Sequence, residues 1–199
     1  IQQSNQVSLD QGMSVTHLFD QLKNMRQSIS VPVLLMGYIN PVLQFGVERF
    51  CQKCQEVGVD GLILPDLPLA EYQQSYQTIF EQYGLLNIFL ITPQTSDERI
   101  KQIDAISEGF IYMVSSASTT GAKTGISSDQ EAYFKRIDNM NLKNPRLVGF
   151  GISDRESFLK ASNGASGAII GSAFVKLLGN AKNLREEIVG FVKSIKGLK

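Results

Sequence analysis

Six short apolar runs recur along the chain, and each is separated from the next by an amphipathic stretch. The runs are apolar throughout and do not alternate with polar residues, which is typical of strands buried on both faces of a parallel sheet. A regular alternation of such strands with helices predicts a parallel α/β architecture. The six runs are Val31–Tyr38, Gly61–Asp66, Asn87–Thr92, Phe110–Ser115, Arg146–Gly151 and Gly167–Ala173.

The stretches between the runs carry helix start and stop signals. Thr95, Ser128 and Ser153 are each followed three residues later by Glu, the pattern of a capping box at a helix N-terminus. Gly84 and Gly164 stand where helix C-terminal glycines belong. These signals predict helices that follow the strand runs.

Two parallel architectures fit this order, an open doubly wound sheet and a (β/α)8 barrel with members missing. A complete barrel typically needs about 250 residues, whereas this chain has 199. The difference corresponds to about two βα units. Because an amphipathic helix near residues 14–27 precedes the first run, the missing units of a barrel would lie at the N-terminus.

Composition excludes several classes of function. The chain has 19 basic and 19 acidic side chains and no Lys/Arg cluster, which argues against a nucleic-acid partner. No apolar run reaches the ~18–20 residues of a membrane span. Two Cys cannot form a disulfide framework, so we expect a soluble intracellular protein. Cys51 and Cys54 lie in a helical stretch with no second pair, which favours two half-buried residues over zinc or redox chemistry. The only His, His17, favours neither a metal site nor a catalytic triad.

Glycine-rich turns follow the last two runs. Gly149 and Gly151 lead into one expected helix, and Gly167, Gly171 and Ser172 lead into the next. Glycine lets the backbone approach a ligand closely, and the N–H groups of a helix N-terminus favour an anion. The alternative is that the glycines only make tight turns. Two such turns in succession favour a phosphate site.

The segment from Ser115 to Ser128 is small, polar and longer than the usual 2–6 residues of a βα connection. It is interpreted as a lid over the strand ends, and the alternative is an ordinary surface loop. Tyr38 and Asn40 end another run and could form a pocket rim or an ordinary turn. Asp66, between two prolines, is a candidate acid or base, although a cap or an interface role is favoured.

At these residues the sequence resembles the tryptophan synthase alpha chain family. The matching segments occur in order through the whole chain and include Pro65-Asp66-Leu67-Pro68 and the Gly-rich turns. The others are Ile1-Gln2, Gly12, Leu35–Pro41, Val57–Leu64, Ile91-Thr92-Pro93, Tyr112, Ser115–Gly121, Gly149–Ser153 and Gly171–Ala173.

The resemblance implies one (β/α)8 TIM barrel domain over residues 1–199, with about six of eight βα units present and the N-terminal two missing. It implies a lyase that cleaves indole-3-glycerol phosphate to indole and glyceraldehyde 3-phosphate by a retro-aldol reaction. This is a late step of tryptophan biosynthesis in the cytoplasm. The enzyme would work in an α2β2 heterotetramer with a beta chain. The alpha chain would need no metal and no cofactor, since pyridoxal phosphate belongs to the beta chain.

The resemblance also assigns site residues in this sequence. Gly121, Gly151, Gly171 and Ser172 would bind the phosphate through backbone amides. Tyr38, Tyr112 and Phe150 would surround the indole and glycerol portions, with Thr120 on the lid. Asn40, Asp66 and Pro68 would face the beta chain.

The catalytic residues are the point of departure from the family. The cleavage needs a base for the indole N–H proton and an acid for the leaving ring carbon. The family supplies them as a Glu and an Asp at positions upstream of Ile1, so no catalytic residue is expected within this sequence. Two alternatives follow: another phosphate-binding barrel, such as an aldose-phosphate isomerase or epimerase, or a non-catalytic module that only binds a beta chain.

Overall fold

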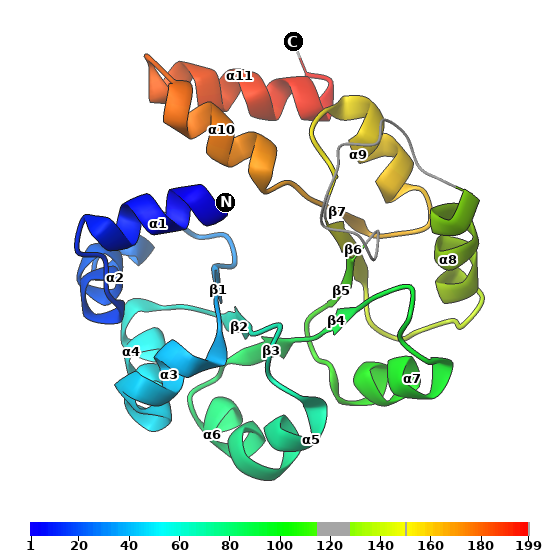
Figure 1. Cartoon of the computed structure of the whole chain (residues 1–199), viewed down its shortest axis with the longest axis horizontal. Coiled ribbons are helices and arrows are strands. Elements are labelled where there is room, and N and C mark those ends of the chain that lie inside the picture. The colour runs from blue at the N-terminus through cyan, green and yellow to red at the C-terminus, as the bar shows by residue number, and fades with distance from the viewer. Residues whose placement is uncertain (115–127, 150, 199) are drawn as a thin grey trace. The chain divides into compact units, whose positions relative to one another are not determined.

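A computed structural model of the chain describes residues 1–114, 128–149 and 151–198. The chain divides into two compact units, each with its own parallel sheet (Figure 1). The N-terminal unit comprises Asn5–Phe89 with Ile106–Gly109, and the C-terminal unit comprises Ile1–Ser4, Leu90–Ala105 and Phe110–Lys199.

The sheet of the N-terminal unit has three parallel strands, β1 (Leu34–Met36), β2 (Gly61–Ile63) and β3 (Leu86–Ile88), in the order β1-β2-β3. All three residues of the central strand β2 are buried. This explains why its run is apolar throughout, because the strand has no solvent-facing side.

Helices pack around this sheet, and α4 contacts three others, α2, α3 and α6. Three aromatic rings pack together where α2, α3 and α4 meet, with centroids 5.3–6.2 Å apart. They belong to Phe19 of α2, Phe45 of α3 and Phe50 of α4. The helices are α2 (Val15–Leu22), the 3-10 helix η1 (Met25–Gln27), α3 (Ile39–Phe45), α4 (Val47–Val57), α5 (Leu69–Glu71), the π-helix η2 (Tyr72–Tyr76) and α6 (Gln77–Gln82). The helix α1 (Gln2–Asp10) has residues in both units.

The start of the chain differs in part from the expectation. Ser14 caps α2 by accepting a hydrogen bond from the His17 backbone N–H, but α2 ends at Leu22 and the segment continues as η1. The helix α1 was not predicted. None of its residues is buried, so it has no apolar stripe by which a sequence pattern could reveal it.

The sheet of the C-terminal unit has four parallel strands in the order β4-β5-β6-β7. Its register sets Tyr112 opposite Leu90 on one side and opposite Leu147 on the other. The strands are β4 (Leu90–Ile91), β5 (Ile111–Val114), β6 (Arg146–Gly149) and β7 (Gly167–Ile169).

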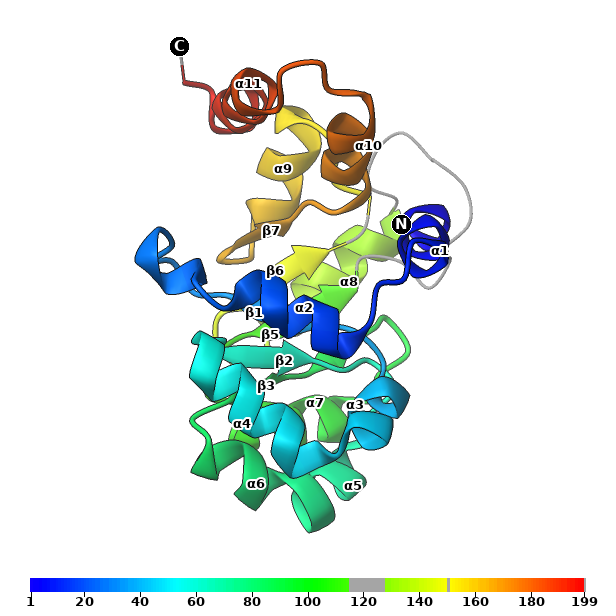
Figure 2. The same ribbon diagram turned by 90° about the vertical axis from the view of Figure 1, so that its left-hand side faces the viewer.

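The helices of this unit follow their strands. The last three, α9, α10 and α11, are joined by contacts of α11 with both α9 and α10, and they lie together in both views (Figures 1 and 2). The helices are α7 (Asp97–Ile106), α8 (Ser128–Asp138), α9 (Arg155–Ser162), α10 (Ser172–Asn180) and α11 (Leu184–Lys196).

Each of the six predicted runs contains a strand, and the described residues hold seven strands because one run is divided. The run Asn87–Thr92 contributes β3 to one sheet and β4 to the other, with Phe89 between them. The strands are parallel, as the apolar runs predicted. Within the described residues, no helix is long and apolar enough to cross a membrane.

Two of the three expected capping boxes are displaced by one residue. Ser96, not Thr95, accepts the Arg99 backbone N–H at the start of α7. Asp154, not Ser153, caps α9, where it exchanges hydrogen bonds with Ser157. Ser128 is the first residue of α8 itself. Where two adjacent residues can both cap a helix, the pattern alone does not decide between them. Gly84 and Gly164 directly follow the C-cap residues of α6 and α9, as predicted, and both have positive φ.

Candidate functional site

The turns after β6 and β7 leave the same edge of the C-terminal unit's sheet. The two strands are parallel neighbours, and the register sets Gly149 opposite Ile169 near their carboxyl ends. Gly151 follows β6 with a φ of +78°, a conformation that glycine adopts without strain. Gly171 follows β7. Both predicted glycine turns are therefore at one edge, where ligands of parallel sheets bind.

The turn after β7 ends at the N-terminus of α10. Gly171 is the N-cap residue, and its carbonyl accepts the Val175 backbone N–H at 3.0 Å. The first N–H groups of a helix have no partner within the helix, so those at the exposed Ser172 and its neighbours can bind an anion. A Cβ atom added to Gly171 would meet only Ile1 Cδ1 at 3.4 Å, an ordinary contact. The glycine therefore leaves room in front of the helix rather than relieving a clash behind it.

Tyr112 lies in β5, beside these strands, and only 5% of its surface is exposed. Its ring and hydroxyl lie against Gly149 of β6 so closely that a Cβ atom there would overlap them. Burial raises the pKa of the Tyr112 phenol above its ordinary value, so the group is neutral at physiological pH. Gly149 thus accommodates an aromatic ring at the edge where the glycine turns begin.

In the N-terminal unit, the segments after β1 and β2 are joined by Asp66. Its two carboxylate oxygens accept the Ile39 backbone N–H at 3.0 and 3.2 Å. Ile39 is the first residue of α3, so the carboxylate caps that helix. Asp66 was expected to cap the helix that follows its own strand, but α5 has Pro68 as its N-cap residue and no side-chain cap. Asp66 instead caps α3, which follows β1.

The residues around Asp66 form an exposed surface. Tyr38, the N-cap residue of α3, is 65% exposed. Asn40, Asp66 and Pro68 are exposed as well, and Pro68 is the N-cap residue of the short helix α5. Leu67, between Asp66 and Pro68, is buried and anchors the loop. The loop therefore presents polar and proline residues to solvent from a fixed backbone.

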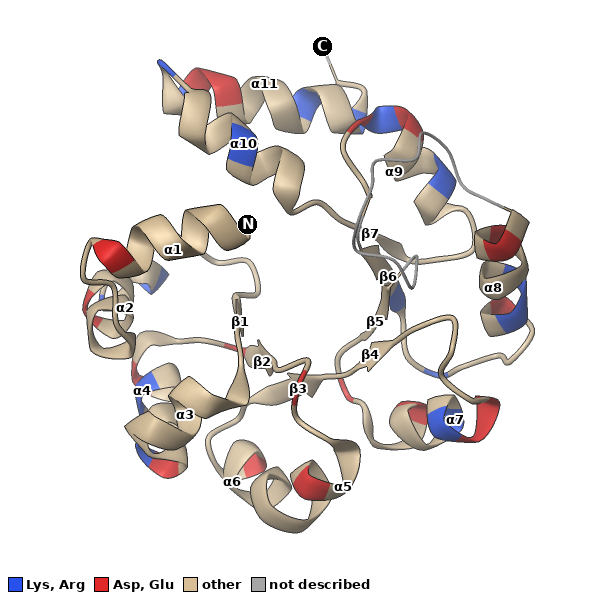
Figure 3. Cartoon of the chain, in the orientation of Figure 1, with Lys and Arg blue, Asp and Glu red and all other residues tan. Residues whose placement is uncertain are grey.

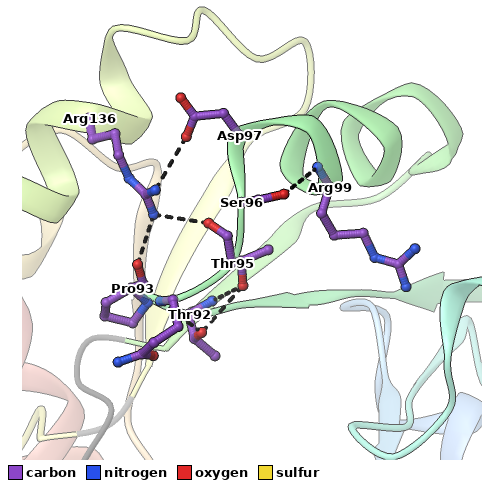
Figure 4. A network of polar contacts seen from close by, with 8 residues as sticks. Thr92, Pro93, Thr95, Ser96, Asp97, Arg99 and Arg136 are labelled. Carbon is purple, nitrogen blue, oxygen red and sulfur yellow. Dashed lines mark hydrogen bonds and ion pairs between the residues drawn. The ribbon is translucent and has the colours of Figure 1, made fainter.

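A polar network holds the turn between β4 and α7 (Figure 4). Arg136 of α8 donates from Nη2 to the carbonyl oxygens of Pro93 and Thr95 at 3.0 and 3.2 Å. Its Nη1 forms an ion pair with Asp97 Oδ1 at 3.2 Å. No local sequence pattern predicts this network, because Arg136 binds two main-chain carbonyl oxygens.

Neither cysteine has the surroundings of a reactive or metal-binding residue. Cys51 and Cys54 are both fully buried free thiols on α4. Among residues 1–114, 128–149 and 151–198, no three His, Cys, Asp or Glu side chains form a group that could hold a metal ion. Both cysteines were expected to be half-buried, but their side chains are fully buried in the structure.

Comparison with known proteins identifies the family. The family described as "Tryptophan synthase alpha chain" matches residues 1–198. The chain is 57% identical over 194 residues to the tryptophan synthase alpha chain of Flavobacterium johnsoniae, a match covering 97% of this chain and 77% of that one. It is also 57% identical to the alpha chain of Christiangramia forsetii, over 100% of this chain and 77% of that one. The chain belongs to the tryptophan synthase alpha chain family.

Solved structures agree with this family assignment. The tryptophan synthase A-subunit of Pyrococcus furiosus has a TM-score of 0.87 and 33% identity, covering 99% of this chain and 79% of that one. A chain of the tryptophan synthase complex of the same organism has a TM-score of 0.88 and 31% identity over the same shares. The predicted fold class, the α/β TIM barrel of the alpha chain family, is confirmed by these neighbours. The presence of two further units upstream and the single-domain organisation of residues 1–199 stay predictions.

Not all the residues that the resemblance assigns to the alpha-chain site fall within the described structure. Thr120, Gly121 and Phe150 lie outside the described residues, as does nearly all of the expected lid from Ser115 to Ser128. The remaining assigned residues fall into two sets. Tyr112, Gly151, Gly171 and Ser172 belong to the C-terminal unit, and Tyr38, Asn40, Asp66 and Pro68 to the N-terminal unit.

Arg136 is a residue that the sequence did not single out. Gly149 was noted only as part of a glycine-rich turn, and nothing in the sequence shows that the neighbouring strand sets a tyrosine ring against it. Arg136 donates hydrogen bonds to main-chain carbonyl oxygens. Every residue has such a group, so the sequence does not show which ones an arginine binds.

Proposed function

We propose that this protein cleaves indole-3-glycerol phosphate to indole and glyceraldehyde 3-phosphate, as its family membership implies. The single observation that carries this function is the family match over residues 1–198. The glycine turn after β7 is consistent with it, because it ends at the N-terminus of α10, where no side chain of the N-cap residue Gly171 takes up the first helix N–H groups.

The phosphate contacts in this proposal are backbone amides of Gly151, Gly171 and Ser172, with Gly121. The resemblance to the family assigns the glycerol and indole portions to Tyr112, Tyr38 and Phe150, and the lid to Thr120. The buried neutral phenol of Tyr112 suits an aromatic ligand because it adds apolar surface without a charge.

The cleavage itself needs an acid and a base, which typically contribute 10²–10⁴-fold each. In the family these are a Glu and an Asp at positions that precede Ile1. The strand-end carboxylate Asp66 is not proposed in their place, because both of its oxygens already face the Ile39 N–H. We propose no metal and no cofactor for this chain. Bond cleavage then depends on proton transfer and on phosphate binding.

The proposed partner is a beta chain, with which this chain would form an α2β2 assembly in the cytoplasm. One solved neighbour belongs to a tryptophan synthase complex. The exposed surface of Asn40, Asp66 and Pro68 is the proposed contact on this chain, and its loop is held by buried Leu67 and by the cap on α3. Pyridoxal phosphate would belong to the partner.

The decisive measurement is release of indole from indole-3-glycerol phosphate by the purified protein, alone and with a beta chain. Indole release supports the proposal. Isomerisation of a sugar phosphate without indole release would favour the isomerase alternative. Co-elution with the beta chain in gel filtration, without indole release in either assay, would favour the binding module.

The phosphate site is tested with Gly171→Val. The φ of Gly171 is −107°, so the substitution brings no backbone strain, but its side chain takes the space in front of α10. We expect the affinity for glycerol 3-phosphate, measured by calorimetry, to fall at least about tenfold, about 1.4 kcal/mol. Gly179→Ala in the same helix, where a Cβ meets nothing within 4 Å, is the control and should bind normally. Unchanged affinity in Gly171→Val would place the phosphate elsewhere.

A further inference from the structure

The turn between β4 and α7 is closed by its own hydrogen bonds. Thr92 N donates to Thr95 Oγ1 at 2.9 Å, and Thr95 N donates back to the Thr92 carbonyl at 3.0 Å. Gln94 N donates to Thr92 Oγ1 at 3.2 Å. The turn is therefore held together by hydrogen bonds between its own residues.

Arg136 ties this unit to α8. Its guanidinium reaches the Pro93 and Thr95 carbonyl oxygens and the Asp97 carboxylate, so it contacts the turn at both ends (Figure 4). The guanidinium carbon also lies 5.6 Å from the centre of the Tyr133 ring, one turn earlier on the same helix. A planar fork of donors suits this set of acceptors, and the ring limits the rotation of the side chain.

The turn lies beside the strand that carries Tyr112. Leu90 of β4 is opposite Tyr112 in the register, and side chains two residues apart in a strand share a face. Thr92 therefore comes next along the face of Leu90 and Tyr112, just beyond the last paired residue, Ile91. On the other side, Gly149 of β6 lies against the Tyr112 ring. The orientation of the turn thus defines one side of the space next to this ring.

We infer that Arg136 is a positioning residue for the aromatic end of the substrate. It contacts no reacting atom. It fixes the Thr92–Ser96 turn against α8, so that the rim next to Tyr112 keeps the shape that receives the indole ring. The inference rests on the proposed function, since it takes Tyr112 as a contact of that ring. The phosphate end, at Gly151 and Gly171, follows other strands and does not depend on this turn.

This separation makes the role measurable with two probes. Glycerol 3-phosphate occupies only the phosphate end, whereas indole-3-propanol phosphate also places an indole ring near Tyr112. The ratio of their dissociation constants reports the aromatic end alone. In Arg136→Gln we expect the affinity for indole-3-propanol phosphate to fall about tenfold, as loss of hydrogen bonds from a charged donor implies. The affinity for glycerol 3-phosphate should change less than about twofold.

Two further variants complete the design. Lys135→Gln removes a charge from an exposed neighbour on the same helix and should leave both affinities unchanged. Arg136→Lys keeps the charge but has no planar fork, so its ratio should fall between wild type and Arg136→Gln. If Arg136→Gln does not fold, Arg136→Lys alone tests the inference. The inference then requires that the ratio of the two dissociation constants for Arg136→Lys is lower than for the wild type.

The possible outcomes distinguish a failure of the positioning role of Arg136 from a failure of the proposed function. If the wild type discriminates between the probes and the Arg136 variants discriminate equally well, Arg136 has only a structural role and the inference is wrong. An equal loss of affinity for both probes would overturn it too, since that is the result of general destabilisation. If the wild type itself does not prefer the indole-bearing probe, the proposed function fails first, and the role of Arg136 with it.

Discussion

Cys51 and Cys54 show how the environment of a side chain determines its chemistry. Burial is the main cause that raises the pKa of each thiol to about 12, and the nearby charge of Glu48 adds to the effect at Cys51. The thiolate is the form that reacts with electrophiles. At about pH 8 a thiol of this pKa is ionised in only about one molecule in 10⁴.

We therefore expect iodoacetamide to leave both cysteines unmodified in the native protein at about pH 8. In concentrated guanidinium chloride, both should be alkylated rapidly, because the unfolded thiols regain an ordinary pKa. Intact-mass spectrometry distinguishes the two states. Rapid modification of the native protein at either position would contradict the burial of α4's inner face.

Asp66 shows what a local sequence pattern can and cannot predict about a single residue. A carboxylate between two prolines at a strand end predicts a cap or an interface residue, and the cap is present. Its partner, however, is the N–H of Ile39, at the start of a helix that follows another strand. Local patterns identify the capping residue type but cannot identify a partner that the fold brings from a distant part of the chain.

At the scale of elements, β5 and β6 depend on Gly149. Any side chain at this position would overlap the Tyr112 ring, so the ring would have to leave its place or the strands would have to separate. For Gly149→Ala we expect a loss of about 1–3 kcal/mol in the free energy of unfolding. The variant should also bind the indole-bearing probe more weakly.

Chemical denaturation and calorimetry measure the two effects of Gly149→Ala. Gly190→Ala is a matched control in α11, where a Cβ meets nothing within 4 Å. Replacing a helical glycine with alanine stabilises by about 0.5–1 kcal/mol, so this control should gain stability. If Gly149→Ala is as stable as the wild type, the close contact between Tyr112 and this strand is refuted.

A second link between elements joins α7 to the segment before β6. The Asp104 carboxylate accepts the backbone N–H groups of Lys143 and Asn144 at 2.9 and 3.0 Å. Partial burial works against its charge, but these bonds and one from the Asn144 side chain outweigh it and hold the pKa of Asp104 below its ordinary value. A carboxyl group with a lowered pKa in the folded state stabilises the fold above its unfolded pKa, and this contribution is lost as pH falls through the folded pKa.

A comparison of the wild type with Asp104→Asn tests whether the stability contributed by Asp104 is lost as the pH falls. Near neutral pH the variant should be less stable, by about 1 kcal/mol for the weakened hydrogen bonds. The difference should shrink as pH falls below about 4, the ordinary pKa of an aspartate. Urea denaturation across this range measures it. A difference that is constant, or that grows in acid, would show that the ionised carboxylate does not stabilise this link.

For the whole molecule, the sequence predicts the class of fold better than it predicts where one sheet ends and the next begins. Continuous apolar runs reveal parallel strands because each strand loses both faces to solvent, and every predicted run contains a strand. The run Asn87–Thr92 looks like one strand because both of its parts are buried. Its division at Phe89 between two sheets depends on pairing with β2 and β5, which no local pattern records. The exposed helix α1 leaves no pattern at all.

The charge of the whole molecule bears on its binding to polyanions. Its 19 basic and 19 acidic side chains cancel, and helices of both units carry both signs side by side (Figure 3). A polyanion binds where basic groups gather on one surface and release counterions. We therefore expect no retention on heparin at low salt and no shift of a labelled DNA duplex in a gel. Solubility should be lowest near neutral pH, where net charge vanishes. Salt-sensitive retention on heparin would show a basic surface that the interspersed charges of these helices do not provide.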